Sequence, residues 1–256
     1  MKEFFVKLPI LKRLIPSIGV RILRLLKKNR SYFKIGNINF YLDFMDPIDR
    51  QIIINKKYED DQVLFLRDQM EKTSFDYFLD IGSNSGYYSF YFADKFKNLK
   101  IKAFEPNLEP FNKFQKTLNK NSFKSIEVFN FGLSDRERKV RTRSMITRNY
   151  VHSNSIIIEN FDKERSKNTK ILEANLKIGD KLFNFFEKKL AFKIDVEGHE
   201  IYTLKGLIKN LLINKCLILI EISDEKFNEV NEFLIKNNFR QIFKSKYRSD
   251  YVYTNF

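Results

Sequence analysis

Apolar and polar residues follow two periods along this chain, and together the periods predict an α/β protein. Short apolar runs alternate with longer stretches in which apolar residues recur every three or four positions. The short runs predict strands at residues 76–81, 100–104, 126–131, 191–196 and 216–222. The longer stretches predict helices at residues 86–97, 108–120, 179–188, 200–211 and 224–237. This alternation favours parallel strands that are joined by right-handed crossovers.

One segment interrupts the alternation, and two others extend it. Residues 136–178 are rich in charged segments of high β propensity, and we interpret them as an antiparallel insertion. Two final strands, at residues 240–243 and 250–254, complete the predicted sheet.

The first part of the chain has a different pattern. Its predicted elements are a basic helical arm, a short β pair and one further helix, at residues 3–29, 32–35, 39–42 and 60–71. We therefore expect the arm and the β pair to occupy residues 1–44, and a single domain to occupy residues 45–256.

Charge is concentrated in the arm. The chain has a net charge of +15, and its first 30 residues hold nine basic residues and one acidic residue. On a helix from residue 18 to residue 28, apolar and basic residues would lie on opposite sides. The apolar side would hold Ile18, Ile22, Leu23, Leu25 and Leu26, and the basic side would hold Arg21, Arg24, Lys27 and Lys28. This pattern fits a helix at the surface of an anionic membrane, and equally a helix whose apolar side packs on the domain.

Composition limits the cellular compartments in which we expect the protein. The sequence has no uninterrupted run of about 18 apolar residues, the length that is needed to cross a bilayer. Lys12 and Arg13 interrupt the only candidate signal-peptide core. The single cysteine, Cys216, begins an apolar run and is interpreted as a core residue in a reducing compartment. We expect a cytoplasmic protein, and peripheral contact of the arm with the inner membrane face is one of the two interpretations left open above. The modest charge outside the arm makes nucleic acid an unlikely partner.

Acidic residues follow two of the predicted strands at positions where α/β proteins bind ligands. The first strand ends at Asp80, and the turn from Gly82 to Gly86 then begins a helix; the second strand ends at Glu105. An acid at that place can accept both hydroxyls of a ribose. A dinucleotide turn would need glycine at positions 84 and 87, where this chain has asparagine and tyrosine, so S-adenosylmethionine is favoured over NAD.

Metal ligands are sparse in the sequence. The chain has only two histidines, His152 and His199, and they lie far apart in the sequence. We therefore predict no metal site. The alternative is a magnesium ion held through water molecules by Asp195 and Glu221, at the ends of two neighbouring strands.

Several motifs in a fixed order resemble the FkbM family of S-adenosylmethionine-dependent methyltransferases, over about residues 45–225. They are Asp49-Arg50-Gln51-Ile52-Ile53, Tyr58-Glu59, Phe78-Leu79-Asp80-Ile81-Gly82-Ser83-Asn84-Ser85-Gly86-Tyr87-Tyr88-Ser89, Ala103-Phe104-Glu105-Pro106-Asn107, Gly132-Leu133-Ser134-Asp135, Lys193-Ile194-Asp195-Val196-Glu197-Gly198-His199-Glu200 and Leu204-Lys205-Gly206. The resemblance implies a class I methyltransferase, Rossmann-like sheet of seven strands in the order 3-2-1-4-5-7-6. It also implies O-methylation, often of a sugar in a glycan, a glycolipid or a natural product.

The resemblance assigns roles by position. Asp80, Gly82, Asn84 and Gly86 would bind the methionine end of the cofactor, Glu105 the ribose, and Leu133 and Asp135 would lie near the adenine. The family commonly has Ala-Asn-Val or Ala-Asn-Ile where this chain has Ser83-Asn84-Ser85, so the contacts of this loop are expected to differ in detail.

The catalytic base is expected on the turn after the strand at residues 191–196. Asp195 is the best-placed candidate, and Glu197 and His199 follow on the same turn. Glu197 and Gly198 could instead simply shape this turn and cap the next helix. The family pattern tolerates other residues at His199.

Two functions from different classes remain open at this stage. The first is an O-methyltransferase with a carbohydrate or glycolipid acceptor. The second is a protein that binds the cofactor without turnover and associates with a membrane or with nucleic acid. Methylation of the amino groups of bases is disfavoured, because that chemistry uses a Pro-Pro-aromatic turn and no proline follows Pro110.

Overall fold

The computed structural model describes residues 29–147, 150–158 and 169–256. The predicted helix of the arm therefore lies almost entirely outside the described residues, as does part of the predicted insertion. The division into an arm with a β pair and one domain stays a prediction.

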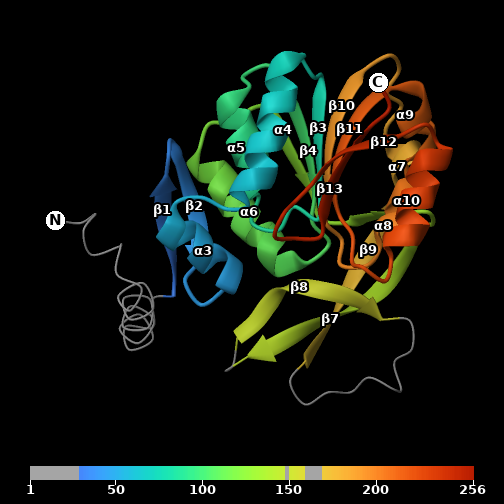
Figure 1. Ribbon diagram of the computed structural model, residues 1–256. Coiled ribbons are helices and arrows are strands. Elements are labelled where there is room, and N and C mark those ends of the chain that lie inside the picture. Colours follow the sequence, from blue (N-terminus) through green and yellow to red (C-terminus); the bar gives the residue numbers. More distant parts are fainter. Residues whose placement is uncertain (1–28, 148–149, 159–168) are drawn as a thin grey trace.

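A seven-stranded sheet forms the centre of the molecule (Figure 1). Its strands, from one edge to the other, are β12 (Arg240–Lys244), β13 (Asp250–Thr254), β11 (Lys215–Glu221), β10 (Lys189–Ile194), β3 (Tyr77–Ile81), β4 (Lys100–Phe104) and β5 (Ile126–Phe129). The five strands from β11 to β5 are parallel, and β13 is antiparallel to both of its neighbours. Counted in chain order from β3 and read from the β5 edge, these seven strands run 3-2-1-4-5-7-6, which confirms the predicted fold class.

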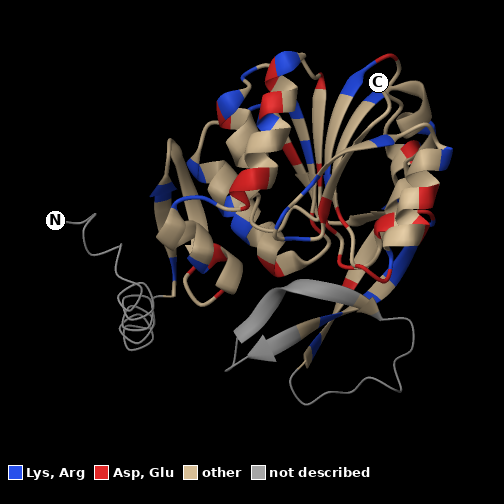
Figure 2. Cartoon of the chain, viewed as in Figure 1, with Lys and Arg blue, Asp and Glu red and all other residues tan. Residues whose placement is uncertain are grey.

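Helices cover both faces of this sheet (Figure 1). One face carries α4 (Asp60–Lys72), α5 (Tyr87–Lys95) and α6 (Leu108–Lys120), and the other carries α7 (Gly179–Leu182), α8 (Glu200–Gly206), α9 (Ile208–Ile213) and α10 (Phe227–Lys236). Successive strand residues point to opposite faces, so Phe78 joins the hydrophobic cluster under α5 while Leu79 joins the cluster under α8. Charged residues lie on the helices and loops and also at several places on the strands of the central sheet (Figure 2).

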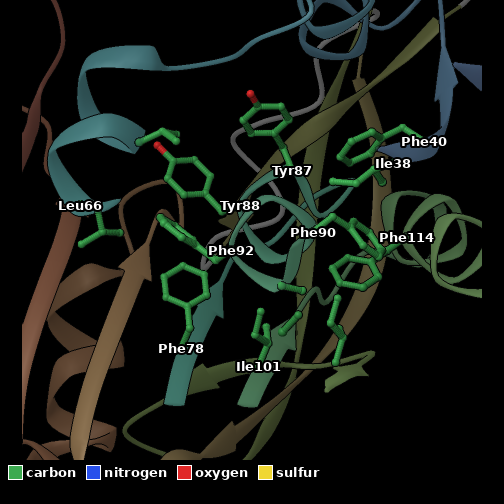
Figure 3. Packing of buried hydrophobic residues seen from close by; sticks show 14 of the residues in the cluster. Ile38, Phe40, Leu66, Phe78, Tyr87, Tyr88, Phe90, Phe92, Ile101 and Phe114 are labelled. Carbon is green, nitrogen blue, oxygen red and sulfur yellow. The ribbon is translucent and has the colours of Figure 1, made fainter. Parts of the chain in front are cut away.

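The β pair and α3 pack into the same hydrophobic core as α4, α5 and α6. Strands β1 (Arg30–Ile35) and β2 (Ile38–Asp43) pair antiparallel, and Phe40 of β2 packs against Phe90 of α5 with ring centroids 5.5 Å apart (Figure 3). Helix α3 (Pro47–Asn55) is held to α6 by a buried ion cluster. In that cluster, Lys113 Nζ lies 2.6 Å from Asp49 Oδ2 and 3.3 Å from Asp46 Oδ2.

The predicted insertion forms a second sheet near one end of the central one (Figure 1). Its strand order is β6 (Gly132–Ser134), β9 (Thr169–Ile178), β7 (Arg138–Thr147) and β8 (Tyr150–Ile158). Strand β7 is antiparallel to both β8 and β9, which confirms the prediction for these three strands. The short strand β6 was not predicted, and it runs parallel to β9.

Two helix predictions need correction, and one helix was missed. The helix predicted at 179–188 is wrong beyond Leu182, because Phe183 and Phe185 are in extended chain and pack on the sheet. Their rings stack 5.7 Å apart, and tertiary packing of this kind overrides local helix propensity. The helix predicted at 200–211 is divided at Leu207 into α8 and α9. Helix α3 was not predicted, although Asp46 caps it and Pro47 begins it, as is typical of helix starts.

No helix within the three described ranges is both long and apolar enough to span a bilayer.

Candidate functional site

A cavity of about 240 Å³ opens at the carboxyl ends of β3, β4, β10 and β11. The strand ends and the turn after β3 form its floor, and Ile48 and Ile52 of α3 form one wall. The small sheet contributes Val140 of β7 and Leu176 of β9 on another side. Ligands of open α/β sheets bind at this place, so the cavity is the candidate site.

The turn after β3 brings backbone very close to the end of β10. Gly82 has φ +79°, and a Cβ atom at this position would lie 1.8 Å from the carbonyl oxygen of Asp195. Gly86 has φ +87°, and a Cβ atom there would lie 2.5 Å from the ring of Phe114. Both positions therefore require glycine. Gly82 and Asn84 line the cavity, whereas Gly86 supports the turn from behind.

Asp80 lies almost completely buried below this turn, with an exposed fraction of 1%. Its Oδ2 atom accepts hydrogen bonds from the backbone nitrogen of Ser89 at 3.1 Å and from the Ser89 hydroxyl at 2.6 Å. Within the described residues, its Oδ1 atom is buried and has no hydrogen-bond partner. Burial raises the pKa of this carboxyl above its ordinary value. A buried acceptor of this kind fits a ligand that carries a positive charge or a hydrogen-bond donor.

Glu105 connects the ends of β3 and β4. Its Oε2 atom accepts a hydrogen bond from the backbone nitrogen of Asn84, and its Oε1 atom accepts one from that of Asn107, both at 2.9 Å. Burial raises the pKa of the Glu105 carboxyl to about 7, although these hydrogen bonds favour the ionised form. Each carboxylate oxygen can accept a second hydrogen bond, so Glu105 can still bind the hydroxyls of a ligand.

The predicted adenine side is lined by Leu133 and His199. The Nε2 atom of His199 lies 2.9 Å from Oγ of Ser134, and its ring stacks on Tyr202, so His199 ties the start of α8 to β6. Asp135 accepts a hydrogen bond from the Ser134 hydroxyl and lies outside the lining that the described residues form.

Lys193 is the main cavity residue that the sequence analysis missed. It stands opposite Asp80 in the register of β10 and β3, and its Nζ atom lies 2.6 Å from Oδ2 of Asp195. Burial acts to lower the pKa of Lys193, but the carboxylates of Asp195, Glu59 and Asp80 outweigh burial and raise it. Lys193 therefore stays charged. A lysine within an otherwise apolar strand, two positions before a candidate acid, was the available signal.

The far wall of the cavity joins distant parts of the chain. Glu59 accepts a hydrogen bond from the Tyr88 hydroxyl at 2.7 Å and forms an ion pair with Arg248, which belongs to the segment between β12 and β13. The Arg248 guanidinium also lies 5.6 Å from the ring centroid of Tyr58. Local sequence patterns could not predict this arrangement, because Arg248 lies 189 positions after Glu59.

Glu197 lies on the exposed turn between β10 and α8, at the rim of the cavity. Glu197 and Gly198 both have positive φ, of 52° and 92°. The backbone nitrogen of Gly198 donates a hydrogen bond to Glu200 at 2.7 Å, so the start of α8 holds the turn in place. This geometry fits the shaping of the turn, which the sequence analysis had left open as an alternative.

Glu221 ends β11 and also lines the cavity. In the part of the chain that the structure describes, no three His, Cys, Asp or Glu side chains are arranged to hold a metal ion. The cavity thus brings together most of the predicted site residues with Glu221, which the sequence analysis had named only as an alternative metal ligand, and it adds Lys193 and Arg248 to them.

Comparison with known proteins identifies a family for this arrangement. The family model described as "Methyltransferase FkbM domain" matches residues 80–241. No curated protein matches the chain in sequence.

Several solved structures are similar to this chain. Precorrin-6y C5,15-methyltransferase from Geobacter metallireducens GS-15 is 12% identical, with 75% of this chain and 85% of that chain covered and a TM-score of 0.43. An rRNA methylase from Streptococcus thermophilus is 12% identical, with 77% and 97% covered and a TM-score of 0.46. A human methyltransferase 10 domain containing protein is 11% identical, with 93% and 95% covered and a TM-score of 0.48.

Proposed function

The chain belongs to the FkbM family of methyltransferases and takes its methyl group from S-adenosylmethionine, and we propose that the acceptor is a hydroxyl group of a sugar in a glycan, a glycolipid or a related metabolite. S-adenosylmethionine supplies an activated methyl group on a sulfonium, so the protein has only to orient the acceptor and remove its proton.

The residues around the turn after β3 fit this cofactor. Glu105 offers carboxylate oxygens to the ribose hydroxyls, and Gly82 allows the turn that lines the cavity to pack closely against the Asp195 carbonyl. Asp80 presents a buried oxygen without a partner among the described residues, which suits the positively charged methionine end. Leu133 supplies an apolar surface for the adenine.

The single observation that supports a hydroxyl acceptor is the pair of carboxylates, Asp195 and Glu221, at neighbouring strand ends. The register pairs Ile194 of β10 with Ile220 of β11, so the two acids follow a matched pair and face the same side of the sheet. Both line the cavity. A hydroxyl must lose its proton to become a good nucleophile, and carboxylates can accept it. The ring of Tyr58 in the same cavity offers a flat apolar surface that suits the face of a sugar.

The test combines cofactor binding with transfer of a labelled methyl group. Radiolabelled S-adenosylmethionine and the purified protein are incubated with separate carbohydrate, lipid, RNA and protein fractions from the source cells. We expect label in the carbohydrate or glycolipid fraction, in a form that survives mild alkali as methyl ethers do. A Glu105→Ala variant should transfer little label and is the matched control. Label confined to RNA or protein, or label released by mild alkali as from a methyl ester, would contradict the proposed acceptor.

A further inference from the structure

The order of the strands sets the order of the acidic groups across the cavity. Strands β4, β3, β10 and β11 are consecutive neighbours, so Glu105, Asp80, Asp195 and Glu221 follow one another along the carboxyl edge of the sheet. If Glu105 and Asp80 bind the cofactor, as proposed above, the methyl acceptor lies toward Asp195 and Glu221. The choice of base is then between these two carboxylates.

Asp195 already forms an ion pair with a buried cation. Its Oδ2 atom lies 2.6 Å from Nζ of Lys193, whose exposed fraction is 7%. Taking a proton on Asp195 would leave the buried lysine without its closest counter-charge, and breaking a buried ion pair is costly. Asp195 is therefore better suited to hold Lys193 in place than to change its own charge.

Glu221, in contrast to Asp195, has no ion-pair partner among the described residues. Among the described residues, no hydrogen bond or ion pair holds its carboxyl group, which lines the cavity. The charged groups that act on it are Asp195 and Lys193 of β10, Asp250 of β13 and Glu59 just before α4. Burial, with the negative charges of Asp195, Asp250 and Glu59, raises the pKa of Glu221 to about 8, and Lys193 acts against this rise. A base is most effective when its pKa lies near the working pH.

We propose that Glu221 is the catalytic residue that takes the proton from the acceptor hydroxyl, while Lys193 and Asp195 act as a positioning pair. In this step a lone pair of the hydroxyl oxygen forms the bond to the methyl carbon. The bond between that carbon and sulfur breaks, and its electron pair stays on sulfur. The hydroxyl proton moves to Glu221. A cationic sulfonium and an ionised Glu221 become a neutral thioether and a neutral carboxylic acid, so the net charge of the buried site does not change. This proposal rests on the function proposed above.

The first test needs no acceptor. S-adenosylmethionine carries the positive charge and S-adenosylhomocysteine does not, while both carry one amino and one carboxyl group. Their affinities are measured by titration calorimetry from about pH 6.5 to about pH 9 in the wild type and in Glu221→Gln. Across this range we expect the preference for S-adenosylmethionine to rise about tenfold more in the wild type than in Glu221→Gln, because ionised Glu221 attracts the sulfonium.

A control variant and a transfer assay complete the design. Glu225→Gln changes an exposed acid beyond the end of β11 and should keep the wild-type pH dependence. With the acceptor fraction found above, Glu221→Gln should slow transfer by about 10² or more while S-adenosylhomocysteine affinity is kept. Asp195→Asn should slow transfer less, and its remaining rate should keep the pH profile set by Glu221.

The outcomes separate this proposal from the one on which it rests. If neither S-adenosyl compound binds, the proposed function itself fails. If both bind but the preference changes with pH to the same extent in the wild type and in Glu221→Gln, the role of Glu221 is overturned. Transfer that is abolished by EDTA and restored by magnesium would also overturn it, because a metal ion would then activate the hydroxyl.

Discussion

Replacing Glu105 with glutamine separates the charge of this side chain from its shape. Both Glu105 oxygens accept backbone hydrogen bonds at 2.9 Å, from Asn84 and Asn107. Glutamine has one acceptor oxygen and one NH₂ group, so one of these backbone nitrogens would face a donor. Hydrogen bonds to charged groups contribute about 1.5 to 3 kcal/mol each, so we expect Glu105→Gln to weaken S-adenosylhomocysteine binding by at least about tenfold at pH 8.

The pH dependence of binding identifies the group that is responsible. Burial raises the pKa of Glu105 to about 7, and the ribose hydroxyls bind best to its ionised form. Wild-type affinity should therefore fall, by up to about tenfold per pH unit, as the pH drops below about 7. The amino and carboxyl groups of the ligand titrate near about 8 and about 3.5, so a window from about pH 5.5 to about pH 7 is free of them. In Glu105→Gln this pH dependence should disappear.

Stability of the protein without ligand should change in the opposite sense. The Glu105 pKa rises from 4.5 to about 7 on folding, so its contribution to stability is complete below pH 4.5 and is lost as the pH rises through 7. A difference of about 2.5 pKa units corresponds to about 3 kcal/mol. Relative to Glu105→Gln, the wild type should therefore lose about 3 kcal/mol of unfolding free energy between about pH 4 and about pH 8. Urea unfolding at both pH values measures this difference.

The control for both measurements is Glu127→Gln. The Glu127 side chain is 62% exposed and lies on β5, beside the strand that Glu105 follows. The Glu127→Gln substitution should leave S-adenosylhomocysteine binding and the pH dependence of stability unchanged. An unfolding difference between wild type and Glu105→Gln that is the same at both pH values would refute the assignment of a raised pKa to Glu105. Unchanged S-adenosylhomocysteine affinity would refute its contact with the ribose.

Three further predictions concern other parts of the molecule. Gly82→Ala places a methyl group 1.8 Å from the carbonyl oxygen of Asp195, so thermal unfolding should occur at a markedly lower temperature, and an unchanged Tm would contradict the close packing. Lys113→Met leaves buried acids without their cation and should cost about 3 to 5 kcal/mol in urea unfolding. Because the pKa of Asp49 is already raised to about 6, this loss should be larger at pH 8 than at pH 5, and equal losses would contradict it. Full-length protein should sediment with anionic liposomes and be released by salt, whereas a chain that begins at Asn29 should not; equal behaviour would mean that the arm packs on the domain.

The periodic pattern of the sequence was sufficient to predict the strands of the central sheet, whereas their order was implied by the resemblance to a family. Runs such as Cys216 to Ile220 are apolar because both faces of a central strand are buried, and the stretches between such runs show the helical period. Prediction failed where long-range packing decided the local structure. Phe183 and Phe185 leave the helix because their rings pack on aromatic residues of β3 and β4, which a local pattern cannot show.

The sequence by itself also determined which acids would reach the site. Asp80 lies near the carboxyl end of a parallel strand, and Glu105 and Asp195 each follow one. The carboxyl ends of parallel strands meet at one edge of the sheet, so all three acids line the cavity. Only the tertiary structure decided what these acids can do. Ionisation depends on burial and on charges that lie close in space, and the groups that set it here come from separate parts of the chain. Lys193 holds Asp195 as an ion pair, whereas the carboxyl of Glu221 lies among like charges, and that difference exists only once the strands are side by side.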